Sequence, residues 1–293
     1  KYFSYGLGLG VYTHTADQYP QFGSQMISVH ERESTFTLND ILANETDLPL
    51  YEHTTDTHGY TDLNFALFDL VGKQFSPRIR DIKDQRLYKI TGKHVQEMDY
   101  PSLKFTGTVN IDYLKRFAND MERVAASLKI GAVTPSTLIN KLQAYPRQNN
   151  LMYVLQSYGQ LIKTIFICKY LLSEALRKRI NTQLNKGEQL HGLRVYLWFG
   201  GDGMIRKKQE QEQQVTARSL NLLTNIIILW NTIYIQEIIN QLRSERVEID
   251  DADFQHISPA PFEHINRLGR YSFNTSFEIE NNGLRPLRKL PEF

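Results

Sequence analysis

The stretch LPLYEHTTDTHGYTDLNFALFDLVGKQFSPRI, residues 48–79, decides the fold class that we expect for this chain. Residues 48–53 have the apolar bias of a strand. A helix is predicted over 62–71, because Thr61 is a good N-cap and apolar residues recur on one helical face. A second strand follows over 74–79. This strand–loop–helix–strand unit indicates an α/β fold.

The loop of this unit holds the densest cluster of candidate metal ligands, His53-x-x-Asp56-x-His58. A carboxylate at the end of a strand is a usual holder of a divalent cation beside a phosphate. The two histidines also permit a zinc or manganese hydrolase. Spacing alone leaves both interpretations open, together with a role for Asp56 as an ordinary turn or helix-cap residue.

Strands dominate the chain before this unit, and helices dominate after it. Strands are expected over 2–5, 9–13 and 26–29, and helices over 37–44, 113–129, 135–144, 151–184 and 205–242. The last helix is very apolar, but Asn221, Asn225 and Asn231 interrupt it, and a membrane span needs roughly 18 or more apolar residues in succession. We therefore expect a buried helix and no membrane partner.

Composition and charge point to a folded protein that handles phosphates. The 293 residues are 41% hydrophobic and 23% charged, and a single cysteine excludes an intrachain disulfide. Residues 1–75 hold 3 Lys/Arg against 10 Asp/Glu, whereas residues 76–186 hold 19 against 8. An acidic block that gathers metal and a basic block that holds phosphates would suit an enzyme acting on nucleic acid, although solvated lysines explain the second block equally well.

A second acidic candidate is Glu188, in Lys186-Gly187-Glu188 at the end of a basic helical region. Taken alone, Glu188 is better explained as a surface glutamate on a solvated face. Arg78, Arg80 and Arg86 alternate with aspartates and form a plausible set of phosphate contacts, which exposed ion pairs would explain as well.

Longer stretches of the sequence are more specific than these short motifs. They are YFSYGLGLGVYTHTADQYPQFGSQMI (2–27), LANETDLPLYEHTTDTHGYTDLNFALFDLVGKQFSPRIRDIKDQRLY (42–88), LNKGEQLHGLR (184–194), LNLLTNIIILWNTIYIQ (220–236) and ISPAPFEHIN (257–266). In these stretches, which run in family order over nearly the whole chain, the sequence resembles the Tn3 family, the large replicative bacterial transposases.

The resemblance implies an α/β fold: an RNase H-like mixed sheet flanked by helices, with a large all-helical insertion and a helical C-terminal region. It divides the chain into an RNase H-like core whose first strand is missing (1–90), the helical insertion (91–175), the catalytic-glutamate helix with C-terminal helices (176–245), and an irregular tail (246–293).

The resemblance also implies a site of the DDE type, in which two aspartates and a glutamate hold two Mg²⁺ ions, with Mn²⁺ as a substitute. Asp56 matches the second aspartate and Glu188 the glutamate. The first aspartate would fall before residue 1, so we expect the isolated fragment to be inactive. The DNA contacts are expected from Arg78, Arg80, Arg86, Arg177, Lys178, Arg179 and Lys186.

The implied function is metal-dependent nicking of 3′ ends at a transposon and strand transfer into target DNA. The partners would be double-stranded DNA, as terminal inverted repeats and target, and a second copy in a homodimer, in the bacterial cytoplasm at the nucleoid. Two alternatives remain: a metallohydrolase that uses His53, Asp56 and His58, and a catalytically dead DNA-binding fragment.

Overall fold

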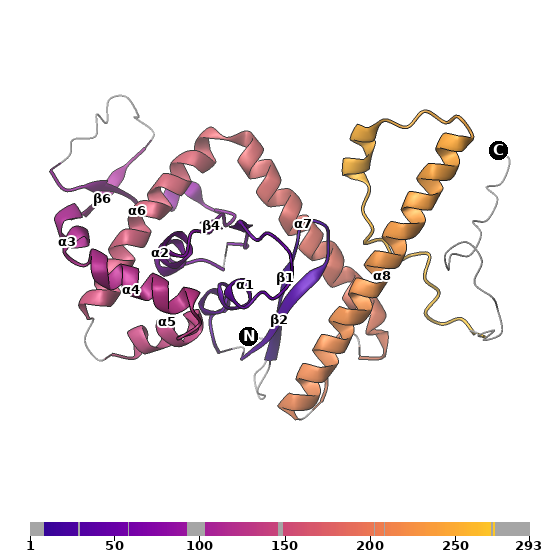
Figure 1. The fold of residues 1–293 in the computed structure, drawn as a ribbon, viewed down its shortest axis with the longest axis horizontal. Helices are drawn as coiled ribbons and strands as arrows, with labels where there is room; N and C mark the ends of the chain where they lie inside the picture. Colours follow the sequence, from indigo (N-terminus) through magenta and orange to yellow (C-terminus); the bar gives the residue numbers. More distant parts are fainter. Residues whose placement is uncertain are drawn as a thin grey trace. The chain divides into compact units, whose positions relative to one another are not determined.

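The computed structural model shows two compact units, residues 1–188 and residues 189–293 (Figure 1). The structure describes residues 9–28, 30–57, 59–92, 103–145, 149–201, 203–207, 209–270 and 272. The strand expected over 2–5 and the candidate ligand His58 lie outside these residues.

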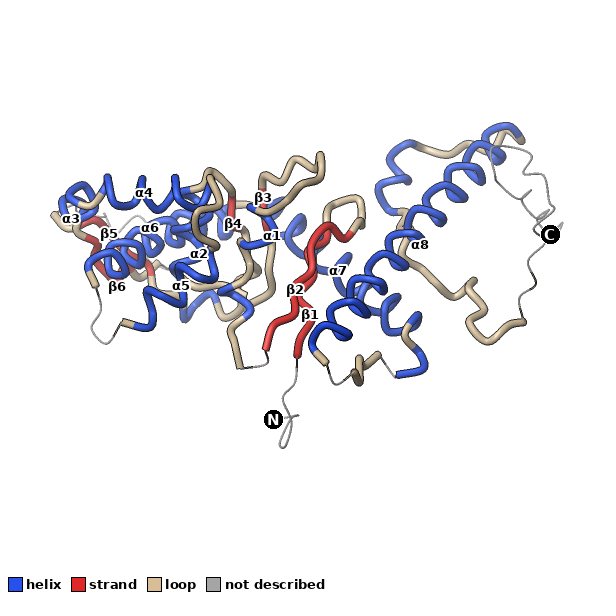
Figure 2. Tube along the Cα trace, turned by 60° about the horizontal axis from the view of Figure 1, so that its bottom comes forward, coloured by secondary structure: helices blue, strands red, loops and turns tan. Residues whose placement is uncertain are grey.

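The N-terminal end of the first unit is a β-hairpin. Strand β1 (Leu9–Thr15) pairs antiparallel with β2 (Gln21–Ser28), and Figure 2 shows the two strands running side by side. Tyr19, in the turn between them, has a positive φ of 72°. The strand expected over 9–13 is confirmed, and the strand expected over 26–29 begins five residues earlier. The helix expected over 37–44 is short, α1 (Asn39–Leu42).

The strand–loop–helix–strand unit is confirmed. The strands β3 (Glu52–His53) and β4 (Gln74–Phe75) are parallel, with α2 (Asp62–Leu70) between them in sequence. Thr61 caps α2 with a capping box, in which the Thr61 hydroxyl accepts from the backbone of Asn64 and the Asn64 side chain accepts in return. After α2, Gly72 adopts a φ of 77°, a conformation that a residue with a Cβ resists.

The core of the first unit forms where α2 packs on α6 (Asn150–Leu172). Phe65 and Phe68 of α2 are fully buried, and Phe65 contacts Phe166 of α6 at 5.5 Å between ring centroids. Gly159 lets the helices approach closely, because a Cβ there would lie 1.8 Å from the carbonyl oxygen of Asp62. This contact fixes α2 and therefore the loop that precedes it.

The expectation of an all-helical insertion over 91–175 is wrong. Strand β6 (Phe105–Val109) lies within it and pairs in parallel with β5 (Leu87–Ile90). Gly107 and Val109 are buried or closely packed while Thr106 and Thr108 are exposed, which is the alternation of a half-buried strand. The segment is too short for its alternation to stand out beside the helices that surround it.

Two of the helices predicted after β6 are in fact pairs of helices. Residues 113–129 divide into α3 (Ile111–Arg116) and α4 (Ala118–Lys129), and α5 (Pro135–Ala144) has the bounds that we expected. The helix predicted over 151–184 breaks at Ser173, where ψ is 105°, and continues as α7 (Glu174–Leu197). The guanidinium of Arg177 donates to the carbonyls of Tyr170 and Leu171, which satisfies the last turn of α6.

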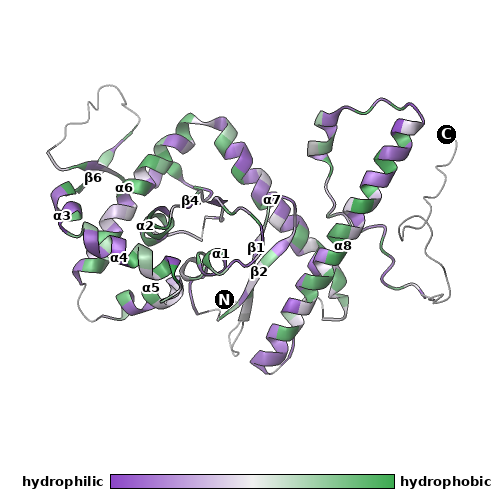
Figure 3. Ribbon diagram, in the orientation of Figure 1, coloured by the Kyte–Doolittle hydropathy of each residue, from purple (hydrophilic) through white to green (hydrophobic). Residues whose placement is uncertain are grey.

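The second unit is built on α8 (Glu210–Ser244), and the expectation that this helix is buried is wrong. Its buried residues are mostly small or polar, whereas Leu222 and Leu229 are 63% and 61% exposed. Hydrophobic residues recur along α8 in Figure 3. Among the described residues, α8 is also the one helix long and apolar enough to cross a membrane by length and composition, a test that core helices of soluble proteins also pass.

Candidate active site

The predicted acidic loop opens into a cavity of about 520 Å³ in the first unit. Its walls are mainly the end of β1 with the turn that follows (residues 12–18), β3 with its flanks (residues 48–56), and one face of α7. Four residues come from α7: Arg179, Gln183, Leu184 and Gly187. The cavity therefore collects segments that are far apart in the sequence.

Asp56 lies at the end of the β3 ladder, where the sequence pattern placed it. The parallel pairing continues beyond the short β3, because the backbone N–H of Ser76 donates to His53 O and that of Arg78 donates to Thr55 O, both at 2.8 Å. Asp56 follows Thr55 directly, lines the cavity and is exposed. Its carboxylate is thus at a strand end and accessible to a cation or a phosphate group.

Glu188 does not line the cavity, although its neighbour Gly187 does. It lies on α7, is exposed, and comes four residues after the cavity-lining Leu184. Residues four apart share a face of a helix, so Glu188 lies one turn beyond Leu184 on the same side. The structure therefore brings the helix of Glu188 to the cavity of Asp56. Gly187, the residue before Glu188, is the last residue of α7 that lines this cavity.

Glu52 carries the densest hydrogen-bond network of this cavity. Its Oε1 accepts from Gln74 Nε2 at 2.9 Å and from Ser76 Oγ, and the guanidinium of Arg179 donates to both carboxylate oxygens at 3.1 Å. Because this fork is bidentate, it joins β3 to α7 with a defined orientation. The sequence gives no sign of this role for Glu52, since its partner lies 127 positions away.

Two histidines line the same cavity, His14 buried and His53 half-buried. His14 of β1 and His53 of β3 lie with ring centroids 5.1 Å apart, and His53 stacks on Phe68. Burial lowers the pKa of His14 to about 4 and lowers that of His53 well below its usual range. Asp40 Oδ2 lies 3.7 Å from His14 Nε2, but the loss of hydration dominates and both rings are neutral near pH 7. Sequence reasoning missed His14, which lies one residue beyond the strand expected over 9–13 and inside the observed β1.

The predicted DNA contacts on α7 have protein partners. Besides the fork between Arg179 and Glu52, Lys186 donates to Asp17 O at 2.7 Å. Lys178 pairs with Glu174 at 2.9 Å, and Arg177 caps α6. Lys178 and Arg179 are exposed, so their outer surfaces also reach solvent.

The other predicted DNA contacts, which all precede β5, are closer to the surface. Arg80 and Arg86 are exposed, and Arg78 is half-buried. Arg80 lies 3.7 Å from its neighbour Asp81, an exposed pair worth little. Arg86 donates to Thr106 O at 3.4 Å.

The donor set of the cavity suits a hard cation only in part. Carboxylate oxygens, such as that of Asp56, are the ligands that Mg²⁺ prefers. Within the described ranges, however, no group of three or more His, Cys, Asp or Glu side chains could hold a metal ion. A complete site would need at least one further oxygen ligand and a closer approach of Glu188.

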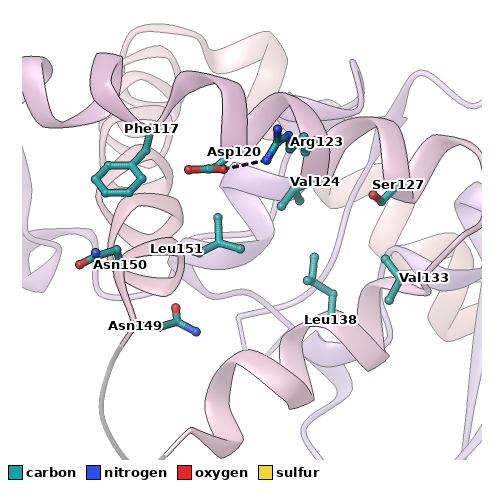
Figure 4. Close-up of a pocket in the computed structure, with 10 residues that line it drawn as sticks. All are labelled: Phe117, Asp120, Arg123, Val124, Ser127, Val133, Leu138, Asn149, Asn150 and Leu151. Atoms are coloured by element: carbon teal, nitrogen blue, oxygen red, sulfur yellow. Dashed lines mark ion pairs between the residues drawn. The ribbon is translucent and has the colours of Figure 1, made fainter.

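A second hollow, of about 530 Å³, lies among α4, α5 and the start of α6. Figure 4 shows Leu138, Leu151 and Val124 along its wall and the ion pair between Asp120 and Arg123 at its rim. Its one carboxylate is already paired with an arginine. This hollow is therefore a poorer place for metal chemistry than the cavity of Asp56.

Asp56 is an accessible aspartate after β3, and α7, which carries Glu188, lines the same cavity. The chain belongs to the Tn3 transposase family: it matches the family described as "Tn3 transposase DDE domain" over residues 1–271.

Proteins with similar sequences are transposases as well. The chain is 40% identical to the transposase of transposon Tn21 from Escherichia coli over 97% of its own length, and 40% identical to that of Tn501 from Pseudomonas aeruginosa over 94%. It is 34% identical to the transposase of transposon gamma-delta from Escherichia coli K12 over 98%. The chain spans 28% of the length of each of these relatives.

Proposed function

We propose that this chain is the catalytic region of a replicative transposase that nicks the 3′ ends of a transposon and joins them to target DNA. The observation that carries the proposal is the family match over residues 1–271. Within these residues, Asp56 and the helix of Glu188 meet at one cavity. The substrate would be double-stranded DNA carrying terminal inverted repeats, together with target DNA. Because its substrate is the bacterial chromosome or plasmid, the protein would act in the cytoplasm at the nucleoid.

In this proposal, Asp56 and Glu188 hold Mg²⁺, or Mn²⁺ in its place. Bound metal would activate water and stabilise the leaving 3′ oxygen. Asp56 supplies an oxygen ligand from the end of a strand, and Glu188 supplies one from α7. The exposed Arg80 and Arg86 would hold the phosphates of the DNA backbone.

We further propose that the core is RNase H-like and that the third ligand, an aspartate, lies in a strand before residue 1. Two features support a place for this strand between β1 and β3. The two strands pair with different partners, β2 and β4, and both line the cavity of Asp56. Ring nitrogens of His14 and His53, and Thr55 Oγ1, are buried without a hydrogen-bond partner in the described structure. A strand that entered here would join the two small sheets and surround these atoms.

The test is metal-dependent nicking of DNA that carries a transposon end, in the longest native polypeptide containing these residues. Asp56→Asn and Glu188→Gln should each lower the rate by at least about 100-fold, because each removes a ligand of the metal pair. Asp47→Asn and Glu122→Gln are matched controls, since both side chains are exposed and neither lines the cavity. Unchanged nicking in either site variant would reject the proposed site.

The same assay separates the alternatives. A metallohydrolase that uses His53 and His58 would lose its metal in His53→Ala but keep it in Glu188→Gln. The structure favours it less, because the Nε2 of the half-buried His53 is shielded from solvent and its ring is stacked on Phe68. A dead DNA-binding fragment would bind DNA with a steep dependence on salt and would nick none of the substrates in any variant.

A further inference from the structure

One arginine of the second unit, Arg267, lies over two aromatic rings at the surface. Its guanidinium carbon is 4.3 Å from the centroid of the Tyr196 ring and 5.2 Å from that of the Phe199 ring. Its Nη1 also donates to Tyr196 O at 3.1 Å. Arg267 is exposed, and Phe199 is 45% exposed in spite of this contact. We call Phe199 and Arg267 the surface pair.

The rings around the surface pair are held in place by further contacts. The Tyr196 ring packs against that of Phe262 with 4.6 Å between centroids, and its hydroxyl donates to Ile265 O. Phe199 begins the short 3-10 helix η4 (Phe199–Gly201). Just before it, the indole N–H of Trp198 donates at 2.9 Å to the backbone of the loop that follows η4. The surface pair is therefore ordered before a partner binds, which lowers the entropy cost of binding.

Positive charge is concentrated in the two segments that carry the surface pair. Residues 194–208 and 262–270 together hold 6 Lys/Arg and 2 Asp/Glu, whereas residues 189–293 as a whole hold 12 and 13. Within the part of the chain that the structure describes, no carboxylate forms an ion pair with Arg267. A cationic segment in an otherwise slightly acidic unit favours a partner that carries phosphate groups.

A second arginine–phenylalanine contact in the same unit differs in this respect. Arg243 lies over the ring of Phe254, with 4.9 Å to its centroid, but its guanidinium also forms an ion pair with Asp251. The charge of Arg243 is therefore already balanced within the protein. Arg267 instead keeps its charge and most of its N–H donors available to an acceptor from outside.

We propose that the surface pair binds an unpaired nucleotide of DNA, whose base stacks on the exposed ring of Phe199 and whose phosphate accepts hydrogen bonds from Arg267. The choice of DNA rests on the proposed function. An aromatic ring stacks on any unpaired base, whereas the bases of a duplex are stacked on one another and show only their edges in the grooves. Phe199 therefore selects single strands, and Arg267 adds a phosphate contact that a duplex also offers.

Such a site suits the product of the proposed reaction. A nick releases the end of one strand, which can then separate from its complement over a few nucleotides. Stacking on Phe199 would hold this end in the unpaired state. Neither contact needs a metal ion, so the binding is measurable in the presence of EDTA.

The test is the affinity of this chain for a short fluorescein-labelled oligothymidylate, measured by fluorescence anisotropy in EDTA, with a duplex of the same length for comparison. Phe199→Leu should weaken binding of the single strand at least about fivefold, because one stacked base is lost, and leave duplex binding unchanged. Phe199→Trp should retain single-strand binding. Arg267→Met should weaken both and reduce the slope of log K against log salt for the single strand by about 0.7.

Arg243→Met and Phe254→Leu are the matched controls, because they remove the same groups from a pair whose charge is balanced. Both should leave the two affinities unchanged, and circular dichroism checks that every variant is folded. A direct measurement uses the unsubstituted chain. Ultraviolet crosslinking to an oligonucleotide that contains 5-iododeoxyuridine, followed by peptide mapping, should place the crosslink within residues 196–199.

The proposal is overturned if the chain does not bind the single strand, if Phe199→Leu binds it normally, or if Phe199→Leu weakens single-strand and duplex binding equally. A crosslink in a different segment would have the same consequence. If nicking depends on Asp56 and Glu188 while these affinities do not change, the surface pair fails and the proposed function stands. If the affinities change as expected while Asp56→Asn nicks normally, the proposed function fails and the site for unpaired nucleotides stands.

Discussion

At the scale of single residues, the cavity contains groups whose ionisation opposes folding. His14 and His53 are neutral in the folded protein because burial lowers their pKa values, that of His14 to about 4. In the unfolded chain both histidines titrate near pH 6.5. Between pH 6.5 and 4 the unfolded state therefore binds more protons than the folded state, and stability falls as the pH falls.

We expect the free energy of unfolding to drop on acidification by up to about 1.4 kcal/mol per pH unit for each of these histidines. Chemical denaturation at pH 7, 6 and 5 measures it. His14→Leu should show a shallower slope than the unsubstituted chain, because one of the two sites no longer takes up a proton on unfolding. His30→Gln should keep the original slope, since His30 is exposed. Identical slopes in all three proteins would show that the buried rings are charged when folded.

At the scale of elements, two helical glycines have opposite surroundings. Gly159 lies where α6 touches α2, and a Cβ there would overlap the carbonyl oxygen of Asp62. Gly187 lies on the cavity face of α7, and a Cβ there would meet nothing within 4 Å. Glycine inside a helix is otherwise less favourable than alanine by about 0.5–1 kcal/mol.

Gly159→Ala should therefore lower the free energy of unfolding by about 1–3 kcal/mol, because the two helices must separate. Gly187→Ala should raise it by about 0.5–1 kcal/mol. The pair is its own control, since the same methyl group is added to a helix in both variants. Denaturant unfolding monitored by circular dichroism gives both values, and equal signs would contradict the packing described for α2 and α6.

At the scale of the whole molecule, α8 exposes an apolar face. A folded protein is expected to bury such a face against another surface. Ile226 and Ile233 alternate with Leu222 and Leu229 at spacings of three and four residues, and all four side chains are exposed. Isoleucine and leucine in these alternating positions favour a two-stranded coiled coil. The buried residues Thr224 and Asn231 lie on the opposite face of the helix. We therefore propose that the partner is α8 of a second copy, which would give the homodimer implied by the resemblance to transposases.

Leu222→Glu combined with Leu229→Glu should convert a dimer into a monomer, as measured by sedimentation velocity. Leu268→Glu is the matched control, because Leu268 is 79% exposed and lies outside α8. A monomer in the unsubstituted chain would contradict self-association. Binding of that monomer to lipid vesicles, lost in the double variant, would instead identify a membrane as the partner of this face.

The elements that local rules govern follow from the sequence alone. Thr61 with Asn64, the apolar face of α2 and Gly72 define the strand–loop–helix–strand unit, because caps and periodicity act over a few neighbouring residues. The same reasoning placed Asp56 at the end of a strand. The family, too, follows from long stretches of sequence.

Contacts between distant residues needed the tertiary structure. The fork between Glu52 and Arg179, the meeting of His14 with His53, and the short parallel strand β6 depend on partners far along the chain. The exposure of α8 was not predicted for a related reason. Its apolar residues indicate that burial of one face is favourable, but they do not indicate which surface buries it. A sequence fixes local preferences through neighbours, whereas side-chain partners are chosen only when the folded chain brings remote segments within a few ångströms.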